Sequence, residues 1–261
     1  MNLILVRHGE TDWNTERRWQ GQLDVPLNGK GQWQARRAAQ ALADRPITRL
    51  ISSDLQRALV TAESIAAACG RPVKTDPRLR EMGFGAWEGL TYNEIMESDA
   101  DSYTLWKENP FFHAPSGAET LDVAGRRIIH AWQEIEREYV DTVVLVSHGG
   151  TLRVLLCHLL GLPPEAFWQL KLCNASVSTV QISPAGNTLI SLNDTDHLQT
   201  EEEGDVCNLT LCRVCDRPSG RAGVSLVYAG RGKVVGAWMG LRKYHGDGRA
   251  VRSLCLFDEA S

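Results

Sequence analysis

Two patterns of apolar positions alternate along the first 200 residues of the chain. Short apolar runs typical of buried strands are followed by longer stretches with apolar residues at helical spacing. The expected strands cover residues 3–6, 49–52, 72–75, 142–146, 176–182 and 188–193. The expected helices cover residues 29–44, 54–69, 119–139 and 150–160, with further helical pieces between residues 91 and 140. This alternation predicts an α/β fold: a three-layer sandwich with a mostly parallel central sheet flanked by helices.

Local residues add detail to two of these elements. Asp54 stands where an N-cap is expected, and Gly70 comes just past the last apolar position of the same helix. The last two strands are separated by Pro184-Ala185-Gly186-Asn187, which predicts a hairpin at the end of this region.

Three predicted strands end in residues that are unusual next to a core. Residues 3–6 run into Arg7-His8-Gly9, residues 142–146 run into Ser147-His148-Gly149, and residues 49–52 lead to Arg57. Ligands of parallel sheets bind beyond the carboxyl ends of the strands. We therefore expect two histidines and two arginines to meet at one place.

Such a cluster is suited to phosphoryl chemistry. Arginine forks neutralise phosphate oxygens, and the helix that starts near Gly149 would add backbone N–H donors. A neutral imidazole can attack phosphorus, and the leaving oxygen then needs a proton donor. Glu81, which stands among glycines, is the favoured donor, and Glu88 and Glu10 are the alternatives. Each histidine alone could be a core residue, but the joint pattern favours a site.

Six segments in order carry a family resemblance over about residues 1–198. They are Arg7–Asn14, Gln20-Gly21, Pro26–Gly31, Ser52–Ala62, Glu81–Gly89 and Val146–Gly149. Together they resemble the signature of the histidine phosphatase superfamily, which includes cofactor-dependent phosphoglycerate mutases and implies a phosphoglycerate mutase-like fold.

The resemblance also implies a role for each matching residue. His8 would be the phosphorylated nucleophile, Glu81 the general acid and later the base, and Arg7, Arg57 and His148 the phosphate pocket. Binding residues for the phosphoryl group or substrate would be Asn14, Gln20, Gly21 and Gly149. The resemblance implies no metal ion, and we expect this chain to need no cofactor. The expected partner is therefore a small-molecule phosphate ester.

The spacing of the motifs favours hydrolysis over mutase chemistry. Only 67 positions separate Glu81 from His148, and Lys107 is the only positive side chain between Glu81 and Gly125. A phosphoglycerate would require more positive charge, and fructose-bisphosphatase-like activity is disfavoured for the same reason.

Two loops resemble the α-ribazole phosphatases of cobalamin biosynthesis. Residues 84–95 match that group, and residues 115–120 match its PxGES segment apart from one small residue. The expected cap is aromatic, with Tyr103, Trp106, Phe111 and Phe112, which suits a bulky apolar base. The predicted reaction is removal of the 5′-phosphate from α-ribazole phosphate or cobamide phosphate. A broad-specificity phosphatase is the alternative, and a phosphoglycerate mutase is less favoured.

Composition limits the class of protein. A net charge of −4 does not favour nucleic-acid binding, and no apolar run has the length of a membrane span. The first residues do not match a signal peptide. Seven irregularly spaced cysteines predict no disulfide framework. We therefore expect a cytoplasmic protein with reduced thiols, and a homodimer is one option for its oligomeric state.

The last quarter of the chain differs in composition. Residues 1–206 hold 19 basic and 28 acidic residues, whereas residues 207–261 hold 9 and 4. This change predicts a phosphatase domain over residues 1–200, an acidic linker over 201–206 and a basic, Cys- and Gly-rich tail over 207–261.

Three interpretations of the tail remain open. It could be a basic docking segment with a hairpin around Val224–Tyr228, or a poorly ordered extension, which we favour. It could also be a zinc module, although its single CxxC pair is a weak signal. The zinc ligands would come from Cys207, Cys212, Cys215, His245 and Cys255.

Overall fold

The central feature of the computed structural model is a six-stranded sheet in the order β3-β2-β4-β1-β5-β6. The structure describes residues 1–138, 141–199, 223–230, 233–240 and 255–258. β3, β2, β4 and β1 run parallel, and β5 and β6 run antiparallel to their neighbours. The mostly parallel sheet and the hairpin at its end are thus confirmed. The strands are β1 (Asn2–Arg7), β2 (Arg49–Ser52), β3 (Val73–Thr75), β4 (Thr142–Ser147), β5 (Val177–Gln181) and β6 (Thr188–Asp194).

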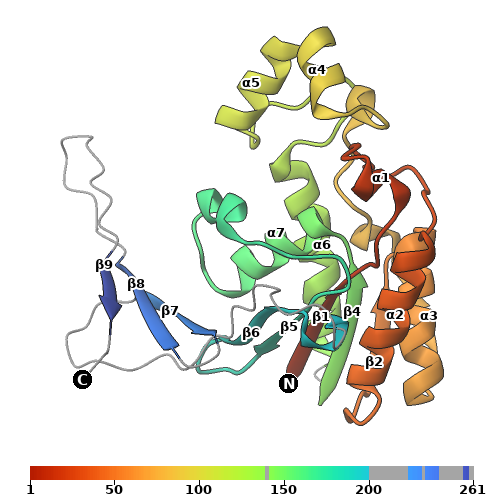
Figure 1. Cartoon of the computed structure of the whole chain (residues 1–261), viewed down its shortest axis with the longest axis vertical. Helices are drawn as coiled ribbons and strands as arrows, with labels where there is room; N and C mark the ends of the chain where they lie inside the picture. The colour runs from red at the N-terminus through yellow and green to blue at the C-terminus, as the bar shows by residue number, and fades with distance from the viewer. Residues whose placement is uncertain (139–140, 200–222, 231–232, 241–254, 259–261) are drawn as a thin grey trace.

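Helices cover both faces of this sheet, as the three-layer prediction requires. In Figure 1, α2 and α3 lie on one side of the strands and α6 and α7 on the other, while α4 and α5 lie beyond one end of the sheet. The helices are α1 (Asp12–Thr15), α2 (Gly29–Leu42), α3 (Gln56–Cys69), α4 (Tyr92–Ser98), α5 (Ala100–Glu108), α6 (Leu121–Arg137) and α7 (Gly149–Leu159).

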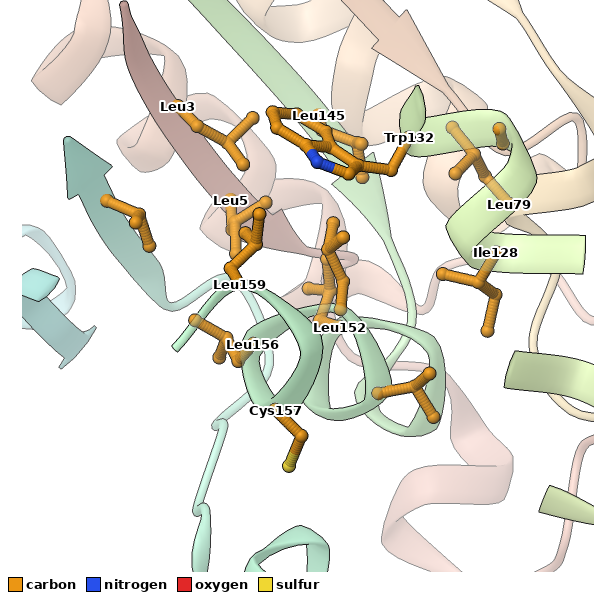
Figure 2. Packing of buried hydrophobic residues seen from close by; sticks show 14 of the residues in the cluster. Leu3, Leu5, Leu79, Ile128, Trp132, Leu145, Leu152, Leu156, Cys157 and Leu159 are labelled. Carbon is orange, nitrogen blue, oxygen red and sulfur yellow. The ribbon is translucent and has the colours of Figure 1, made fainter. Parts of the chain in front are cut away.

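Side chains of β1 are buried on both faces of the sheet. Leu3 and Leu5 pack with Trp132 of α6 and the apolar face of α7, as Figure 2 shows, whereas Ile4 and Val6 pack on the side of α2 and α3. A strand covered on both faces must be apolar throughout, which explains the continuous apolar run before the first histidine. The packed layers therefore fix the end of β1 rigidly.

Of the two predicted caps of α3, the one at the C-terminus is confirmed and the one at the N-terminus is wrong. Gly70 adopts the left-handed conformation at the C-cap, with φ of 68°, as predicted. Asp54 does not cap the helix, since the N-cap is Leu55 and the first N–H of α3, that of Gln56, donates to Oδ1 of Asp24 at 2.7 Å. The carboxylate of Asp54 instead accepts a hydrogen bond from Nε of Arg80 at 2.7 Å. The guanidinium offers this carboxylate a charge-assisted partner, which is stronger than a backbone N–H.

A second sheet lies in the tail. β7 (Gly223–Gly230) pairs antiparallel with β8 (Lys233–Gly240), which pairs with β9 (Cys255–Asp258). The first pair is the hairpin expected around Val224–Tyr228. The linker 201–206 and the candidate zinc ligands Cys207, Cys212, Cys215 and His245 lie outside the described residues. The domain division, the zinc module and the poorly ordered tail therefore stay predictions. Among the helices of the described part, none has the length and apolarity to cross a membrane.

Candidate active site

The ends of β1 and β4 place two histidines side by side. Arg7 pairs in register with Ser147, and the backbone N–H of His8 donates to the carbonyl of Ser147 at 2.9 Å. The next residue on each strand is a histidine, and the ring centroids of His8 and His148 lie 5.1 Å apart. Both side chains are buried. Parallel strands thus bring together the two motifs that the sequence placed at strand ends.

Hydrogen bonding determines which nitrogen of His8 is free. Its Nδ1 lies 2.6 Å from the carbonyl oxygen of Gly9, which can only accept, so Nδ1 carries the ring hydrogen. Burial lowers the pKa of His8 well below its usual value, and the positive charges of Arg57 and Arg7 lower it further. The ring is therefore neutral near pH 7, with a lone pair on Nε2. This is the form that can attack phosphorus.

His148 has the opposite arrangement. Its Nε2 lies 2.8 Å from Oγ of Ser53, and that hydroxyl accepts from the N–H of Leu55. Burial, followed by the charge of Arg57, keeps the pKa of His148 well below its ordinary value. When the hydroxyl of Ser53 donates its hydrogen to Nε2, Nδ1 of His148 carries the ring hydrogen and is an N–H donor. Within the described residues this nitrogen has no hydrogen-bond partner.

Two arginines complete the group of donors. Arg57 is fully buried and donates from Nη1 to the carbonyl of Leu23 at 2.7 Å and from Nη2 to that of Gly21 at 2.8 Å. Burial lowers the pKa of Arg57 to about 10, so it stays charged near neutral pH. Arg7 donates from Nη1 to the carbonyl of Leu172 at 2.7 Å. The Nε atoms of both arginines are buried and lack a partner among the described residues, which makes them available to an oxyanion.

Glu81, in the loop after β3, lines a cavity together with Arg7, His8 and Arg57. Its carboxylate accepts hydrogen bonds from the backbone N–H groups of Gly150 at 3.0 Å and Thr151 at 3.1 Å, at the start of α7. A Cβ on Gly150 would lie 2.6 Å from Oε1 of Glu81, so this approach requires glycine. The carboxylate is therefore fixed at the N-terminus of the helix that follows His148.

The alternative carboxylates lie elsewhere. Glu88 accepts hydrogen bonds from the N–H groups of Gln22 and Phe84, each at 3.0 Å, and holds together the loop that carries Trp87. Glu10 contacts Asn28 and Lys30. Neither of these glutamates lines the cavity, whereas Glu81 does.

A cavity of about 310 Å³ collects the remaining predicted residues, since Asn14, Gln20, Gly21 and Gly149 all line it. Oδ1 of Asn14 accepts from the N–H of Thr11 and from Nδ2 of Asn174, both at 3.1 Å. The amide nitrogen of Asn14 is therefore the atom left to donate to a ligand.

The cavity also contains positive side chains that the sequence analysis missed. Arg17, Arg18 and Arg153 line it, so the expected shortage of basic residues, inferred from Lys107 alone, is wrong. That inference considered only the segment after Glu81, whereas these arginines come from the loop after α1 and from α7. Arg153 could have been found, because it lies one helical turn after Gly149-Gly150. No comparable signal marks Arg17 or Arg18.

These arginines differ in their partners. Arg18 is paired with Glu16 at 2.7 Å and with Glu94 at 3.0 Å. Arg153 lies 5.6 Å from the ring centroid of Phe167, and no carboxylate pairs with it within the described residues. Its Nε is buried and also lacks a partner there.

Aromatic side chains also line the cavity, and we call this group its aromatic wall. The ring of Trp106 lies 5.2 Å from that of Trp19 and 5.1 Å from that of Trp168. The composition of the expected cap needs correction, because Tyr103, Phe111 and Phe112 do not line the cavity and Phe112 is 78% exposed. The aromatic residues that line it are Trp13, Trp19, Phe84, Trp106, Phe167 and Trp168.

Comparison with known proteins agrees with this geometry. Phosphoserine phosphatase 1 of Hydrogenobacter thermophilus is 36% identical over 199 residues, which cover 76% of this chain and 94% of that protein. Phosphoglycerate mutase-like protein 4 of Arabidopsis thaliana is 38% identical over 202 residues, which cover 76% of this chain and 86% of that protein.

Among solved structures, the chain is also similar to phosphatases. A mycobacterial glucosyl-3-phosphoglycerate phosphatase superposes with a TM-score of 0.67 at 34% identity, covering 74% of this chain and 99% of that one. The α-ribazole phosphatase from Shigella flexneri superposes with a TM-score of 0.70 at 30% identity, covering 74% and 96%. The family model of the histidine phosphatase superfamily (branch 1) matches residues 3–195. This match spans most of the chain, which therefore belongs to branch 1 of the histidine phosphatase superfamily.

Proposed function

We propose that the protein hydrolyses phosphate monoesters through a phosphohistidine on His8. The observation that carries this proposal is the free Nε2 of His8, whose ring lines one cavity with Arg7 and Arg57 and lies 5.1 Å from the ring of His148. Donors placed in this way can hold the phosphoryl oxygens and stabilise the charge of the transition state. The superfamily membership and the relatives named as phosphatases support the same reaction.

The reaction would take two steps. Nε2 of His8 forms a bond to phosphorus while the bond from phosphorus to the ester oxygen breaks, and Glu81 gives its proton to that oxygen. Water then attacks the phosphohistidine, the bond from nitrogen to phosphorus breaks, and the carboxylate of Glu81 takes a proton from the water. His8 and Glu81 return to their starting states, and the products are an alcohol and phosphate.

For the natural substrate we propose the 5′-phosphate of α-ribazole phosphate or cobamide phosphate, in cobalamin biosynthesis. The aromatic wall of the cavity supports this proposal, because Trp19 and Trp168, which are not fully buried, can stack on a flat heteroaromatic base. Similarity to an α-ribazole phosphatase of known structure adds support.

A specific observation favours a second candidate, the phosphate ester of a small carboxylic acid. Arg153 is a partly buried cation in the cavity with no ion-pair partner among the described residues. A desolvated cation is costly unless an anion pairs with it, and a substrate carboxylate would serve. The names phosphoserine phosphatase and glucosyl-3-phosphoglycerate phosphatase, borne by relatives, point in this direction.

The two candidates can be separated by kcat/KM measured with four esters: α-ribazole 5′-phosphate, phosphoserine, 3-phosphoglycerate and 4-nitrophenyl phosphate. Each ester is assayed with the native enzyme and with Arg153→Gln. The first candidate predicts a preference for α-ribazole phosphate that survives Arg153→Gln. Preference for a carboxylate ester, lost in Arg153→Gln, would establish the second. Similar values for all four esters would instead indicate the broad-specificity phosphatase.

A further inference from the structure

The loop that carries Glu81 is held by one arginine of α6. Arg127 donates from Nη1 to the carbonyls of Arg78 at 2.8 Å and Arg80 at 2.9 Å, and from Nη2 to the carbonyl of Glu81 at 2.8 Å. Its other two N–H groups bind the carboxylate of Glu119, from Nε at 2.7 Å and from Nη2 at 2.6 Å. A guanidinium has five N–H donors, and this one uses all of them.

Glu119 ties the same loop from its other side. Besides Arg127, its carboxylate accepts from the backbone N–H of Gly83 at 2.9 Å and from Nε2 of Gln22 at 3.3 Å. Burial tends to raise the pKa of Glu119, but its hydrogen bonds with Arg127 and Gly83 outweigh burial and keep the pKa below its ordinary value. The pair therefore stays ionised near neutral pH and contacts the backbone on both sides of Glu81.

This backbone depends on side-chain partners for its geometry. Residues 80–84 belong to no helix or strand, so no regular ladder satisfies their carbonyl and N–H groups. The carboxylate of Glu81 is anchored separately by the N–H groups of Gly150 and Thr151. Arg127 thus fixes the backbone of Glu81, and α7 fixes the position of its carboxylate.

We propose that Arg127, held in place by Glu119, is a positioning residue for proton transfer by Glu81. This inference rests on the proposed function, in which Glu81 protonates the leaving oxygen. A displacement of about 1 Å in a catalytic group can cost on the order of 10²-fold in rate. Because the proton matters only for poor leaving groups, loss of Arg127 should slow esters of alcohols and spare esters with stable leaving anions.

The experiment compares Arg127→Lys with the native enzyme on two esters, phosphoserine and 2,4-dinitrophenyl phosphate. Lysine keeps the charge but not the planar fork that reaches three carbonyls and a carboxylate. We expect kcat/KM to fall on the order of 10- to 100-fold for phosphoserine and to change by no more than about threefold for the dinitrophenyl ester. Arg126→Lys is the matched control, since Arg126 is 70% exposed, pairs with Asp122 and should leave both rates unchanged.

Glu81→Gln separates failure of this inference from failure of the proposed function. If Glu81→Gln lowers kcat/KM equally for both esters, Glu81 is not the proton donor and the proposed function is wrong in that step. If Glu81→Gln is selective for phosphoserine but Arg127→Lys slows both esters equally, or neither, the positioning role is overturned. In the double variant Glu81→Gln/Arg127→Lys we expect no further loss with phosphoserine beyond that of Glu81→Gln, because the two residues act through one step.

A second variant covers the case in which Arg127→Lys does not fold. Glu119→Gln keeps the size of the side chain and one oxygen acceptor, but it cannot accept both N–H groups of the fork. We expect the same selectivity for phosphoserine with a smaller loss. An equal loss on both esters, or none on either, would overturn the proposal on its own.

Discussion

The rings of His8 and His148 lie 5.1 Å apart, and hydrogen bonds leave a different kind of atom free on each. The carbonyl of Gly9 binds Nδ1 of His8, so its free Nε2 carries a lone pair. Oγ of Ser53 lies 2.8 Å from Nε2 of His148, and when that hydroxyl donates to Nε2 the free Nδ1 carries a hydrogen. In the proposed reaction, the first ring attacks phosphorus and the second donates a hydrogen bond to a phosphoryl oxygen.

The two buried histidines should make stability depend on pH. In the unfolded chain each protonates near pH 6.5, whereas in the fold the pKa of each is held well below that value, chiefly by burial. The unfolded state therefore binds more protons below pH 6.5, and the free energy of unfolding falls as pH drops through that range. Each histidine contributes up to about 1.4 kcal/mol per pH unit, and its stabilisation is fully present above pH 6.5.

Denaturant unfolding between pH 7.5 and 5.0 in phosphate-free buffer measures this dependence. His148→Gln should show a shallower loss of stability towards low pH than the native protein. Parallel curves for the two proteins would show that the pKa of His148 in the fold is close to its ordinary value, which would contradict this account.

Gly150 should be essential for placing Glu81. In Gly150→Ala the new Cβ would meet Oε1 of Glu81 at 2.6 Å, so the carboxylate must move away from α7. We expect kcat/KM to fall on the order of 10- to 100-fold with phosphoserine. Gly29→Ala is the matched control, since Gly29 also lies in the first turn of a helix but a Cβ there meets nothing within 4 Å. Equal activity of the two variants would contradict the placement of Glu81.

Trp132 should be a main source of stability for the layer formed by α6. It is 1% exposed and packs with Leu3 and Leu5 of β1. Trp132→Ala should cost about 3–5 kcal/mol in the free energy of unfolding, because it leaves a cavity that the rigid sheet cannot close. Val123→Ala on the same helix, where the side chain is 44% exposed, should change that free energy by no more than about 0.5 kcal/mol. Denaturant titration measures both, and similar losses would contradict the packing.

The layers and most of the cluster could be predicted from sequence because both follow from local patterns. Apolar runs such as the one in β1 mark strands buried on both faces, and carboxyl ends of neighbouring parallel strands meet at one edge. Arg7 is the last residue of β1, and His8 directly follows it. His148 directly follows β4. Their proximity therefore required only the order of strands and helices.

Other contacts could not be predicted, because they depend on pairs that are distant in sequence. The local sequence predicts that Asp54 caps a helix, but in the fold its carboxylate accepts a hydrogen bond from Arg80. Arg17 lines the cavity, and its backbone adopts the left-handed conformation with φ of 58°. No local sequence pattern indicated this conformation. The five hydrogen bonds of Arg127 need the loop after β3 and the start of α6 to lie together, and only the fold provides that arrangement.

The most direct test of the account is to identify the residue that carries the phosphoryl group during turnover. The enzyme is mixed with phosphoserine, stopped within the first turnover in alkali, where phosphohistidine is stable, and its peptides are analysed by mass spectrometry. We predict one added phosphoryl group on His8, and neither the adduct nor measurable turnover in His8→Ala. A phosphoryl group on another residue, or hydrolysis at the native rate by His8→Ala, would contradict the account.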